Sequence, residues 1–261
     1  MRAIGVDLAW GANGRTGLCA AEAGRVLDSA TVRTDDEIDA WISRWTAGAR
    51  DVIVAIDAPL IVENDAGRRP CERVFCSAMA GRQAGVYPAH LNLPAFRDGV
   101  RGAALARRLG LTVDPAACVT APVRAAIEVY PHSALISLFE LARTIKYKGR
   151  PGRAPAARRA AFDDLLARLR ALAGLDPPLD VTTSPRWQAL QMLVSAGRLA
   201  AAEDELDAYV CAYVAIYHRR WHGRRSLVVG DVASGYIVTP VDDAAGAALR
   251  AWGERLAVPV S

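Results

Sequence analysis

One apolar segment constrains the fold of this chain more than any other. Residues 51–60 read DVIVAIDAPL, a continuous β-branched run that is typical of a strand buried on both faces and parallel to its neighbour. Residues 35–47 before it repeat Ile and Trp at helical spacing, which predicts an amphipathic helix. Thr34 and Glu37 have the spacing of a capping box at its start. A helix that leads into a parallel strand predicts a layered α/β fold.

The segments on either side of this unit complete the predicted sheet. Three strand-like segments precede the helix, and the links between them are short, so we expect an antiparallel meander. A further strand, a series of helices and a terminal hairpin follow. The expected strands lie at 2–9, 16–24, 25–34, 51–60 and 124–131, the later helices at 132–142, 160–175 and 203–221, and the hairpin at 224–240.

Two segments depart from regular structure. Residues 61–122 are rich in Gly, Pro and Arg, which favours an insertion within a single domain spanning 1–261 over a separate second domain. Within this insertion, 70–80 and 96–111 are expected to hold short helices. Residues 143–159 contain seven Lys and Arg and no acid, and the Gly and Pro at their centre predict a basic loop.

Composition excludes several classes of protein. An apolar fraction of 52% is sufficient for a sizeable core, yet no stretch approaches the roughly 18 continuous apolar residues of a membrane helix. The N-terminus lacks the pattern of a signal peptide, so we expect a cytoplasmic protein with no membrane partner. Five scattered cysteines fit neither a disulfide framework nor a zinc site. The net charge of +4 is too small to identify a nucleic-acid partner by itself.

Four aspartates stand in apolar sequence, where an ionised carboxylate is costly unless it is paired or binds a metal. Asp7 and Asp57 each lie at the end of a predicted strand. If those strands are parallel neighbours, both carboxylates emerge at one sheet edge, where sites form in α/β proteins. Asp204 and Asp207 are three residues apart and share a face of the predicted helix. Each aspartate taken alone also fits a turn, a cap or a helix dipole.

A stripe of small residues on the same helix face indicates how the acids could meet. Ala208, Cys211 and Ala215 would let the helix approach a strand closely, and so bring its aspartates to the strand end. Clustered carboxylates repel one another, and hard divalent cations with oxygen ligands relieve that repulsion. We therefore expect a shared Mg²⁺ or Mn²⁺ site. Two such ions can stabilise both the attacking and the leaving oxygen of phosphodiester cleavage, with metal-bound water as the nucleophile.

The arrangement of these acids resembles a known superfamily. An Asp on the first strand, an acid on the fourth and an Asp-x-x-Asp on a late helix are similar to the ribonuclease H-like superfamily, above all its Holliday-junction resolvase branch. GVDLAWG, AIDAPL, GRRPCER, IEVYPHSAL, DELDAYVCAY and GYIVTP resemble the domain-of-unknown-function 429 family, which is described as predicted nucleases of ribonuclease H fold. These motifs span nearly the whole chain.

The resemblance implies both a fold and a set of site residues. The fold is a three-layer α/β arrangement with a mixed five-stranded sheet, helices on both faces and insertions. The positions that match metal ligands are Asp7, Asp57, Asp204 and Asp207. Resolvases often have Glu at the fourth-strand position, and the shorter Asp57 would change the metal spacing or recruit a bridging water.

The resemblance also marks Glu128 and His132, which follow one another across the end of the fifth predicted strand. Either residue could be a fifth ligand or a general base, since histidine titrates near neutrality. The alternative is that Glu128 pairs with an arginine and that His132 caps the following helix.

Basic residues supply candidates for substrate binding. Lys146 and Lys148 in the basic loop could contact nucleic-acid phosphates, with Tyr147 stacking on a base; the alternative is a solvated loop. Three arginines downstream of Asp57 could hold a phosphate near the metals, namely Arg68, Arg69 and Arg73.

These observations favour a metal-dependent nuclease or phosphodiesterase that uses a two-metal mechanism on nucleic acid, with DNA, RNA and the oligomeric state left open. One alternative is an ATP-dependent phosphotransferase of the actin-like or sugar-kinase kind, although no second matching half-domain is evident in the sequence. The other is a catalytically silent protein that binds nucleic acid through its basic loop.

Overall fold

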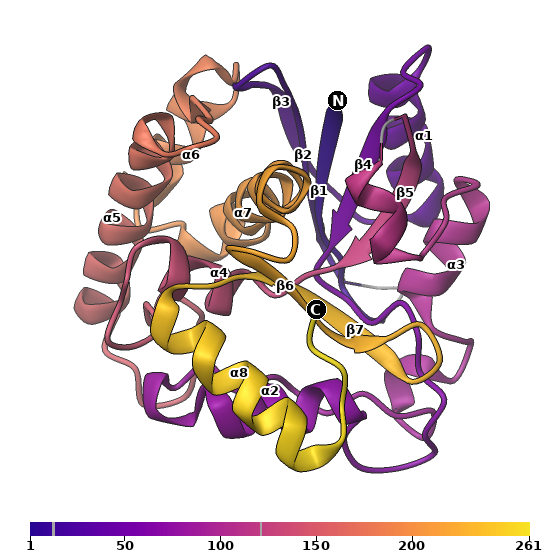
Figure 1. Cartoon of the computed structure of the whole chain (residues 1–261). Coiled ribbons are helices and arrows are strands. Elements are labelled where there is room, and N and C mark those ends of the chain that lie inside the picture. Colours follow the sequence, from indigo (N-terminus) through magenta and orange to yellow (C-terminus); the bar gives the residue numbers. More distant parts are fainter. Residues whose placement is uncertain (12–13, 121) are drawn as a thin grey trace.

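A mixed five-stranded sheet organises the chain, which the computed structural model describes over residues 1–11, 14–120 and 122–261 (Figure 1). The strands are β1 (Arg2–Asp7), β2 (Thr16–Glu22), β3 (Arg25–Val32), β4 (Val52–Ile56) and β5 (Arg124–Glu128). Their order across the sheet is β3-β2-β1-β4-β5. β1, β4 and β5 are parallel, and β2 is antiparallel to both β1 and β3. The predicted meander, crossover and parallel strand are confirmed.

Helices cover both faces of this sheet. The helices are α1 (Asp35–Thr46), α2 (Pro70–Ala78), α3 (Arg101–Arg108), α4 (Pro131–Leu138), α5 (Pro155–Ala171), α6 (Trp187–Ser195), α7 (Leu199–Trp221) and α8 (Asp243–Leu256). Short 3₁₀ turns lie at Ala80–Arg82, Pro94–Phe96, Pro115–Val119, Leu172–Gly174 and Val181–Thr183. In Figure 1, α1 and α3 lie on one face, while α7 lies on the other with α5 and α6 beyond it. The three layers are consistent with the expected ribonuclease H-like fold.

The parallel register brings the two strand-end aspartates side by side. Val6 of β1 is opposite Ile56 of β4, and the Asp57 amide donates a 2.8 Å hydrogen bond to the Val6 carbonyl. All five residues of β4 are buried, as a central strand covered on both faces requires. On the other side of β4, Glu128 of β5 is opposite Ile56, so an acidic residue stands at the end of each of three adjacent strands.

Two glycines allow α7 to lie directly on the sheet. A Cβ on Gly5 would come within 1.9 Å of the Ala208 carbonyl oxygen, and one on Gly17 would meet the Asp204 carbonyl oxygen at the same distance. The small Ala208 on the helix side completes this close approach, as its place in the stripe of small residues predicts. The contact places the N-terminal half of α7 against the end of β1.

A second apolar cluster joins the insertion to the C-terminus. α2 packs against α8 and against the hairpin of β6 (Ser226–Asp231) and β7 (Gly235–Pro240), which lies at the end of β5 through a bridge between Val129 and Val238. The hairpin confirms the prediction, whereas α6 and α8 have no counterpart in the sequence-based expectations. The sequence nevertheless carries a signal for α8: Asp242 is its N-cap and accepts a hydrogen bond from the Ala245 amide, and the buried residues recur at helical spacing.

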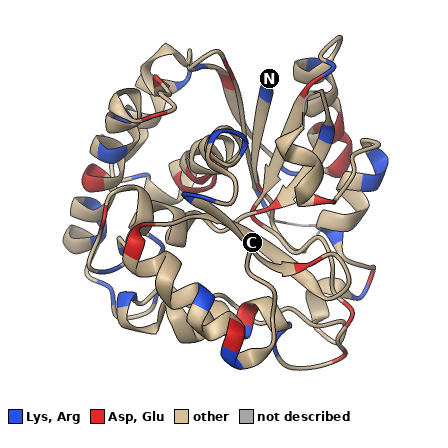
Figure 2. Ribbon diagram, viewed as in Figure 1, with Lys and Arg blue, Asp and Glu red and all other residues tan. Residues whose placement is uncertain are grey.

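The basic segment is shorter than predicted. α5 begins at Pro155, so the loop ends at Ala154 and the arginines at 158 and 159 lie on the helix. Proline fits the first helical turn because its missing N–H would have no partner there. Acidic and basic residues are both spread over the molecule (Figure 2), so the charge that bears on function is the local charge at a site.

No helix in the described ranges combines the length and the apolar character that crossing a lipid bilayer requires.

Candidate active site

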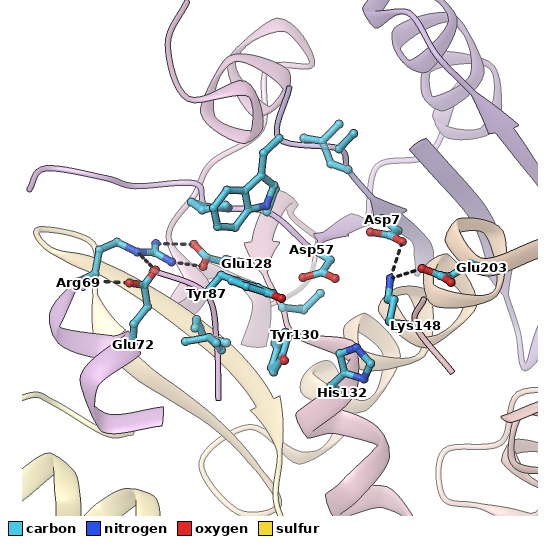
Figure 3. A pocket seen from close by; sticks show the side chains of 18 of the residues that line it. Asp7, Asp57, Arg69, Glu72, Tyr87, Glu128, Tyr130, His132, Lys148 and Glu203 are labelled. Atoms are coloured by element: carbon cyan, nitrogen blue, oxygen red, sulfur yellow. Dashed lines mark hydrogen bonds and ion pairs between the residues drawn. The ribbon is translucent and has the colours of Figure 1, made fainter. Parts of the chain in front are cut away.

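A cavity of about 640 Å³ opens at the carboxyl ends of β1, β4 and β5 (Figure 3). We call it the main cavity. Its lining includes charged and aromatic side chains from the strand ends, the insertion, the basic loop and α7, among them Asp7, Trp10, Asp57, Arg69, Glu72, Tyr87, Glu128, Tyr130, His132, Lys148, Arg150 and Glu203. The position agrees with the rule that ligands bind beyond the carboxyl ends of parallel strands.

The ammonium group of Lys148 lies among the acids at one end of the main cavity. Its Nζ is 3.6 Å from Asp7 Oδ2 and 3.8 Å from Glu203 Oε1, and it forms an ion pair with Asp207. Figure 3 shows Asp7 and Glu203 reaching this ammonium from two sides. Asp207 is fully buried behind the cavity, where the Tyr147 hydroxyl donates a 2.6 Å hydrogen bond to its Oδ1. The basic loop therefore supplies the counter-charge of the acidic cluster.

Burial and mutual repulsion strongly shift the pKa values of the groups in this cluster. Burial raises the pKa of Asp7 well above its ordinary value, and the charges of Asp207 and Asp57 raise it further against the opposing effect of Lys148. Burial also raises the pKa of Asp57 to about 7, again opposed by Lys148. Burial acts to lower the pKa of Lys148, but the charges of Asp207 and Asp7 outweigh it and raise that pKa. Arg158 pairs with Glu203 at 2.7 Å. Lys148 is therefore left to balance Asp7, Asp57 and Asp207, and the group carries an excess of negative charge when all three are ionised.

We expect Asp57→Asn to stabilise the metal-free protein at pH 8. Because the folded-state pKa of Asp57 is about 7 and its ordinary value is 3.8, folding takes up a proton in this interval, so stability falls as pH rises from about 4 to 7. Asparagine carries no charge and avoids this loss. The variant should gain on the order of 2 kcal/mol at pH 8 and almost nothing at pH 4, as measured by urea unfolding in EDTA.

The exposed Asp163 on α5 provides the control for this comparison, since Asp163→Asn should shift stability by less than about 0.5 kcal/mol at either pH. A loss of stability in Asp57→Asn at pH 8 would show that the Asp57 carboxylate is stabilised in the folded protein, contrary to this expectation.

The aspartate pair on α7 divides between two environments. Asp207 joins the cluster, as the sequence predicts, but Asp204 forms an ion pair with Arg15 at 3.0 Å and does not line the main cavity. Glu203, one residue earlier, faces the cavity instead. Positions 203 and 207 are four apart, so they share a helix face as readily as positions 204 and 207, which are three apart. The sequence pattern alone does not decide whether position 203 or position 204 faces the cavity together with position 207.

Glu128 is held in a buried ion-pair network. Arg69 donates to both of its oxygens, through Nη1 at 2.9 Å and Nη2 at 2.5 Å, and the Leu60 amide adds a third hydrogen bond at 3.0 Å. Nε of the same arginine donates to Glu72 at 2.8 Å. Arg69 is 1% exposed. The alternative in which Glu128 pairs with an arginine therefore describes its environment, and this network forms one wall of the main cavity.

The arginines of the GRRPCER motif consequently have different roles. Contrary to the expectation that Arg69 binds a substrate phosphate, its guanidinium is taken up by Glu128, Glu72 and the Ile61 carbonyl. Arg68 and Arg73 are exposed and line neither the main cavity nor the smaller one beside it. A helical turn with Arg69 as N-cap and Glu72 at the third position directs the middle arginine inward and its neighbours outward.

Aromatic and neutral groups form the floor of the main cavity. The ring of His132 packs between Tyr130 and Tyr147, at centroid distances of 5.6 and 5.1 Å, and its Nδ1 is 3.3 Å from Thr144 Oγ1. Burial lowers the pKa of His132 to about 4, so the imidazole is neutral at physiological pH. A neutral ring that borders the acids can exchange hydrogen bonds with a ligand without adding charge.

One bridge spans the mouth between the insertion and the basic loop. Arg150 Nη2 donates a 2.8 Å hydrogen bond to the Tyr87 hydroxyl, and its guanidinium carbon lies 5.7 Å from the centre of the Tyr87 ring. Tyr87 is 63% exposed and stands in front of the cavity in Figure 3. Trp10 lies at another part of the cavity wall, stacked on Phe96 at 5.4 Å. Both aromatic rings are placed to contact a planar ligand group.

The carboxylates near Lys148 are the groups of this site that could bind a divalent cation. Within the described ranges, no three His, Cys, Asp or Glu side chains lie close enough to enclose a metal by themselves. Mg²⁺, however, keeps several waters and needs only one or two carboxylates plus substrate oxygens. The acids around Lys148 supply hard oxygen donors and an excess of negative charge. This donor set fits Mg²⁺ or Mn²⁺ without a closed protein cage.

Comparison with known proteins groups the chain at the level of a family. A family model described as "Protein of unknown function (DUF429)" matches residues 5–234. This range contains the main cavity except for its contribution from Ile237, and it ends one residue before the GYIVTP motif. No curated protein and no solved structure matches the chain.

Proposed function

Since this chain belongs to the DUF429 family, whose description carries no activity, we propose its function from the site: a metal-dependent phosphodiesterase that hydrolyses phosphodiester bonds of nucleic acid. One observation carries the proposal. Carboxylates from the ends of β1 and β4 and from α7 gather at one cavity, where Lys148 pairs with Asp7, Glu203 and Asp207, and Asp57 forms no ion pair with any described residue. Burial raises the pKa of both Asp7 and Asp57, and a bound cation would favour the ionised form of these carboxylates.

Asp7 and Asp57 would supply the one or two carboxylates that Mg²⁺ needs, because they lie side by side at adjacent strand ends. Asp207 would stay behind them, paired from α7 with the Lys148 ammonium that also lies 3.6 Å from Asp7. Tyr147 fixes the Asp207 carboxylate through its 2.6 Å hydrogen bond, which leaves Oδ2 directed at the cluster. A bound Mg²⁺ or Mn²⁺ would supply an activated water and charge stabilisation for the phosphorane-like transition state.

The chain's own cations would hold the substrate phosphate. Lys148 and Arg150 line the main cavity on the side of the basic loop, where the Lys148 ammonium lies among the acids and Arg150 reaches Tyr87. A guanidinium matches two phosphate oxygens at once, while an ammonium acts as a point charge beside them. Lys148, held among the acids, also keeps the mutual repulsion of Asp7 and Asp207 in check when no substrate is present.

Other residues would orient the rest of the substrate and its protons. Trp10 and Tyr87 offer ring faces for a nucleobase, and stacking of this kind tolerates any base. His132, which is neutral at pH 7 because burial lowers its pKa to about 4, would exchange a hydrogen bond with the substrate and not act as its base. The Arg69–Glu128 pair would keep the opposite wall in place without contacting the reacting phosphate.

The proposal predicts that purified protein cleaves at least one member of a substrate panel only when a divalent cation is present. The panel comprises bis(p-nitrophenyl) phosphate, single-stranded, duplex and branched DNA, and RNA, each with Mg²⁺, Mn²⁺ or EDTA. Calorimetric titration with Mn²⁺ should detect binding that Asp7→Asn weakens. Absence of both metal binding and cleavage would refute the proposal.

Two experimental results would indicate a function other than phosphodiester hydrolysis. Nucleic-acid binding that persists in EDTA without cleavage would indicate a binding protein that acts through the basic loop. Stabilisation by ATP in a thermal-shift measurement, together with phosphoryl transfer, would indicate the phosphotransferase.

A further inference from the structure

A second, smaller cavity adjoins the main cavity on the side of the basic loop. Its volume is about 240 Å³, and it shares four residues with the main cavity, namely Tyr130, His132, Lys148 and Arg150. The remainder of its lining comes from the loop after the 3₁₀ turn Ala80–Arg82 and from the basic loop, namely Gln83, Gly85, Thr144, Ile145, Lys146 and Arg153. We call it the basic cavity. Any ligand that occupies it lies next to the acidic cluster, because Lys148 borders both.

The basic cavity differs from the main cavity in its charge. Four of its ten lining residues are Lys or Arg, and no Asp or Glu is found among the described residues that line it. The main cavity, in contrast, is lined by five acids. Lys148 is paired with acids, but Lys146, Arg150 and Arg153 form no ion pair with any described residue. Cations that converge on one small space favour an anion, and the neutral His132 and Thr144 add hydrogen-bonding groups without cancelling that charge.

The cations that line the basic cavity differ in their contacts. Arg153 donates to the carbonyls of Lys146 and Lys148 and so folds the loop around the cavity. Arg150 is directed toward Tyr87 across the main cavity. Lys146 is exposed and forms no ion pair with any acid in the described part of the chain. Its ammonium is therefore available for a ligand.

The size of the basic cavity limits what it can hold. At about 30 Å³ per water molecule, its volume corresponds to roughly eight waters. That is room for a phosphoryl group with part of its hydration, and too little for a base, a sugar and a phosphate together. A terminal phosphate monoester carries nearly two negative charges at neutral pH, whereas a phosphate within a strand carries one and must let the strand continue.

Resting on the phosphodiesterase function proposed above, we propose that the basic cavity binds a terminal phosphate of the substrate, so that the enzyme acts on phosphodiester bonds next to a phosphorylated strand end. The juxtaposition of an acidic cluster with a phosphate-sized basic cavity carries this inference. The main cavity would then receive the adjoining nucleoside and the diester, with Lys148 between the two phosphates.

Matched oligonucleotides test the inference. One short DNA sequence is prepared with a 5′-phosphate, with a 3′-phosphate, with both ends unphosphorylated, and as a closed circle. We expect kcat/KM to be at least about tenfold higher for one phosphorylated end than for the unphosphorylated strand, and cleavage of the circle to be the slowest. The same preference is expected with an RNA series if RNA is the better substrate.

Two variants tie the preference to the basic cavity. Lys146→Gln should reduce it to less than about threefold, because this side chain lines the cavity without supporting the acidic cluster. Arg143→Gln removes the same charge from the same loop, outside the cavity, and should retain the preference. A preference that is absent in the wild type, or unchanged in Lys146→Gln, would overturn the inference while metal-dependent cleavage leaves the proposed function standing.

A binding measurement separates this inference from the proposed function. Fluorescence anisotropy with the same labelled oligonucleotides, in EDTA, reports end recognition without cleavage. If no substrate is cleaved, tighter binding of a phosphorylated end that Lys146→Gln abolishes would support the cavity assignment alone. Equal binding of all strands would refute it.

Discussion

Replacing Asp7 by asparagine is expected to abolish metal-dependent phosphodiester cleavage without unfolding the protein. Asp7 ends β1 beside Asp57, and its Oδ2 is 3.6 Å from the ammonium that also pairs with Asp207. Asparagine has nearly the same shape, but it removes the charge that would bind the cation. We expect kcat/KM to fall by at least about a thousandfold, which corresponds to about 4 kcal/mol of transition-state stabilisation. Initial rates at saturating Mn²⁺ measure this loss.

Two further variants show whether the loss belongs to the acidic cluster. Asp204→Asn should cost much less than Asp7→Asn, because Asp204 pairs with Arg15 outside the main cavity. Asp163→Asn on α5 should leave the rate unchanged. The thermal midpoint of Asp7→Asn should equal or exceed that of the wild type, since burial disfavours the charged form of Asp7. Cleavage by Asp7→Asn at more than about a tenth of the wild-type rate would exclude Asp7 as a ligand.

The sheet was predictable because its elements carry local signals. The fully apolar β4 and the capping box of Thr34 and Glu37 arise from residues near one another in sequence, and both are present in the structure. Parallel pairing of β1 with β4 then follows from a single crossover. α8 carries local signals of the same kind, the N-cap Asp242 and buried residues at helical spacing, and the sequence-based expectations omitted it although these signals are present.

The site was predictable where a residue's position follows from a strand end. Asp7 and Asp57 lie where two parallel, adjacent strands end, so both carboxylates emerge close together at the same edge of the sheet. Lys148 was expected to contact phosphates, and its pairing with Asp7 and Asp207 follows from the path of an irregular loop, which local pattern does not encode. The choice between Glu203 and Asp204 depends on a helix rotation that spacing leaves open.

Several sequence motifs meet at the Arg69 side chain instead of at the acids around Lys148. GRRPCER supplies Arg69 and Glu72, and IEVYPHSAL supplies Glu128. GYIVTP begins with Gly235, where a Cβ would lie 2.9 Å from Arg69 Nη1 and 2.7 Å from the Ile61 carbonyl oxygen. Its φ of +94° also favours glycine. These motifs build the wall that holds the insertion, the hairpin and β5 together beside the main cavity.

Arg69→Met is expected to destabilise the protein by about 3–5 kcal/mol. Arg69 is 1% exposed and binds Glu128 and Glu72, which are also buried. Methionine retains much of the apolar stem but leaves two carboxylates without their counter-charge, and an uncompensated buried charge costs far more than the net value of an ion pair. Urea unfolding at pH 7.5 measures the change, and lowering the pH should reduce it because protonation neutralises Glu128, whose pKa is raised by burial.

A double variant and a surface control show whether the loss of stability comes from this buried network or from the removal of any arginine. Arg69→Met combined with Glu128→Gln should recover part of the lost stability, since one of the two orphaned charges is removed. Arg108→Met, which breaks partly exposed pairs with Asp39 and Asp35, should cost less than about 1 kcal/mol. A loss in Arg69→Met as small as that in Arg108→Met would mean that water or another cation reaches Glu128 and Glu72. The wall of the cavity would then be an accessible charged surface, and Arg69 would again be a candidate for contact with the substrate.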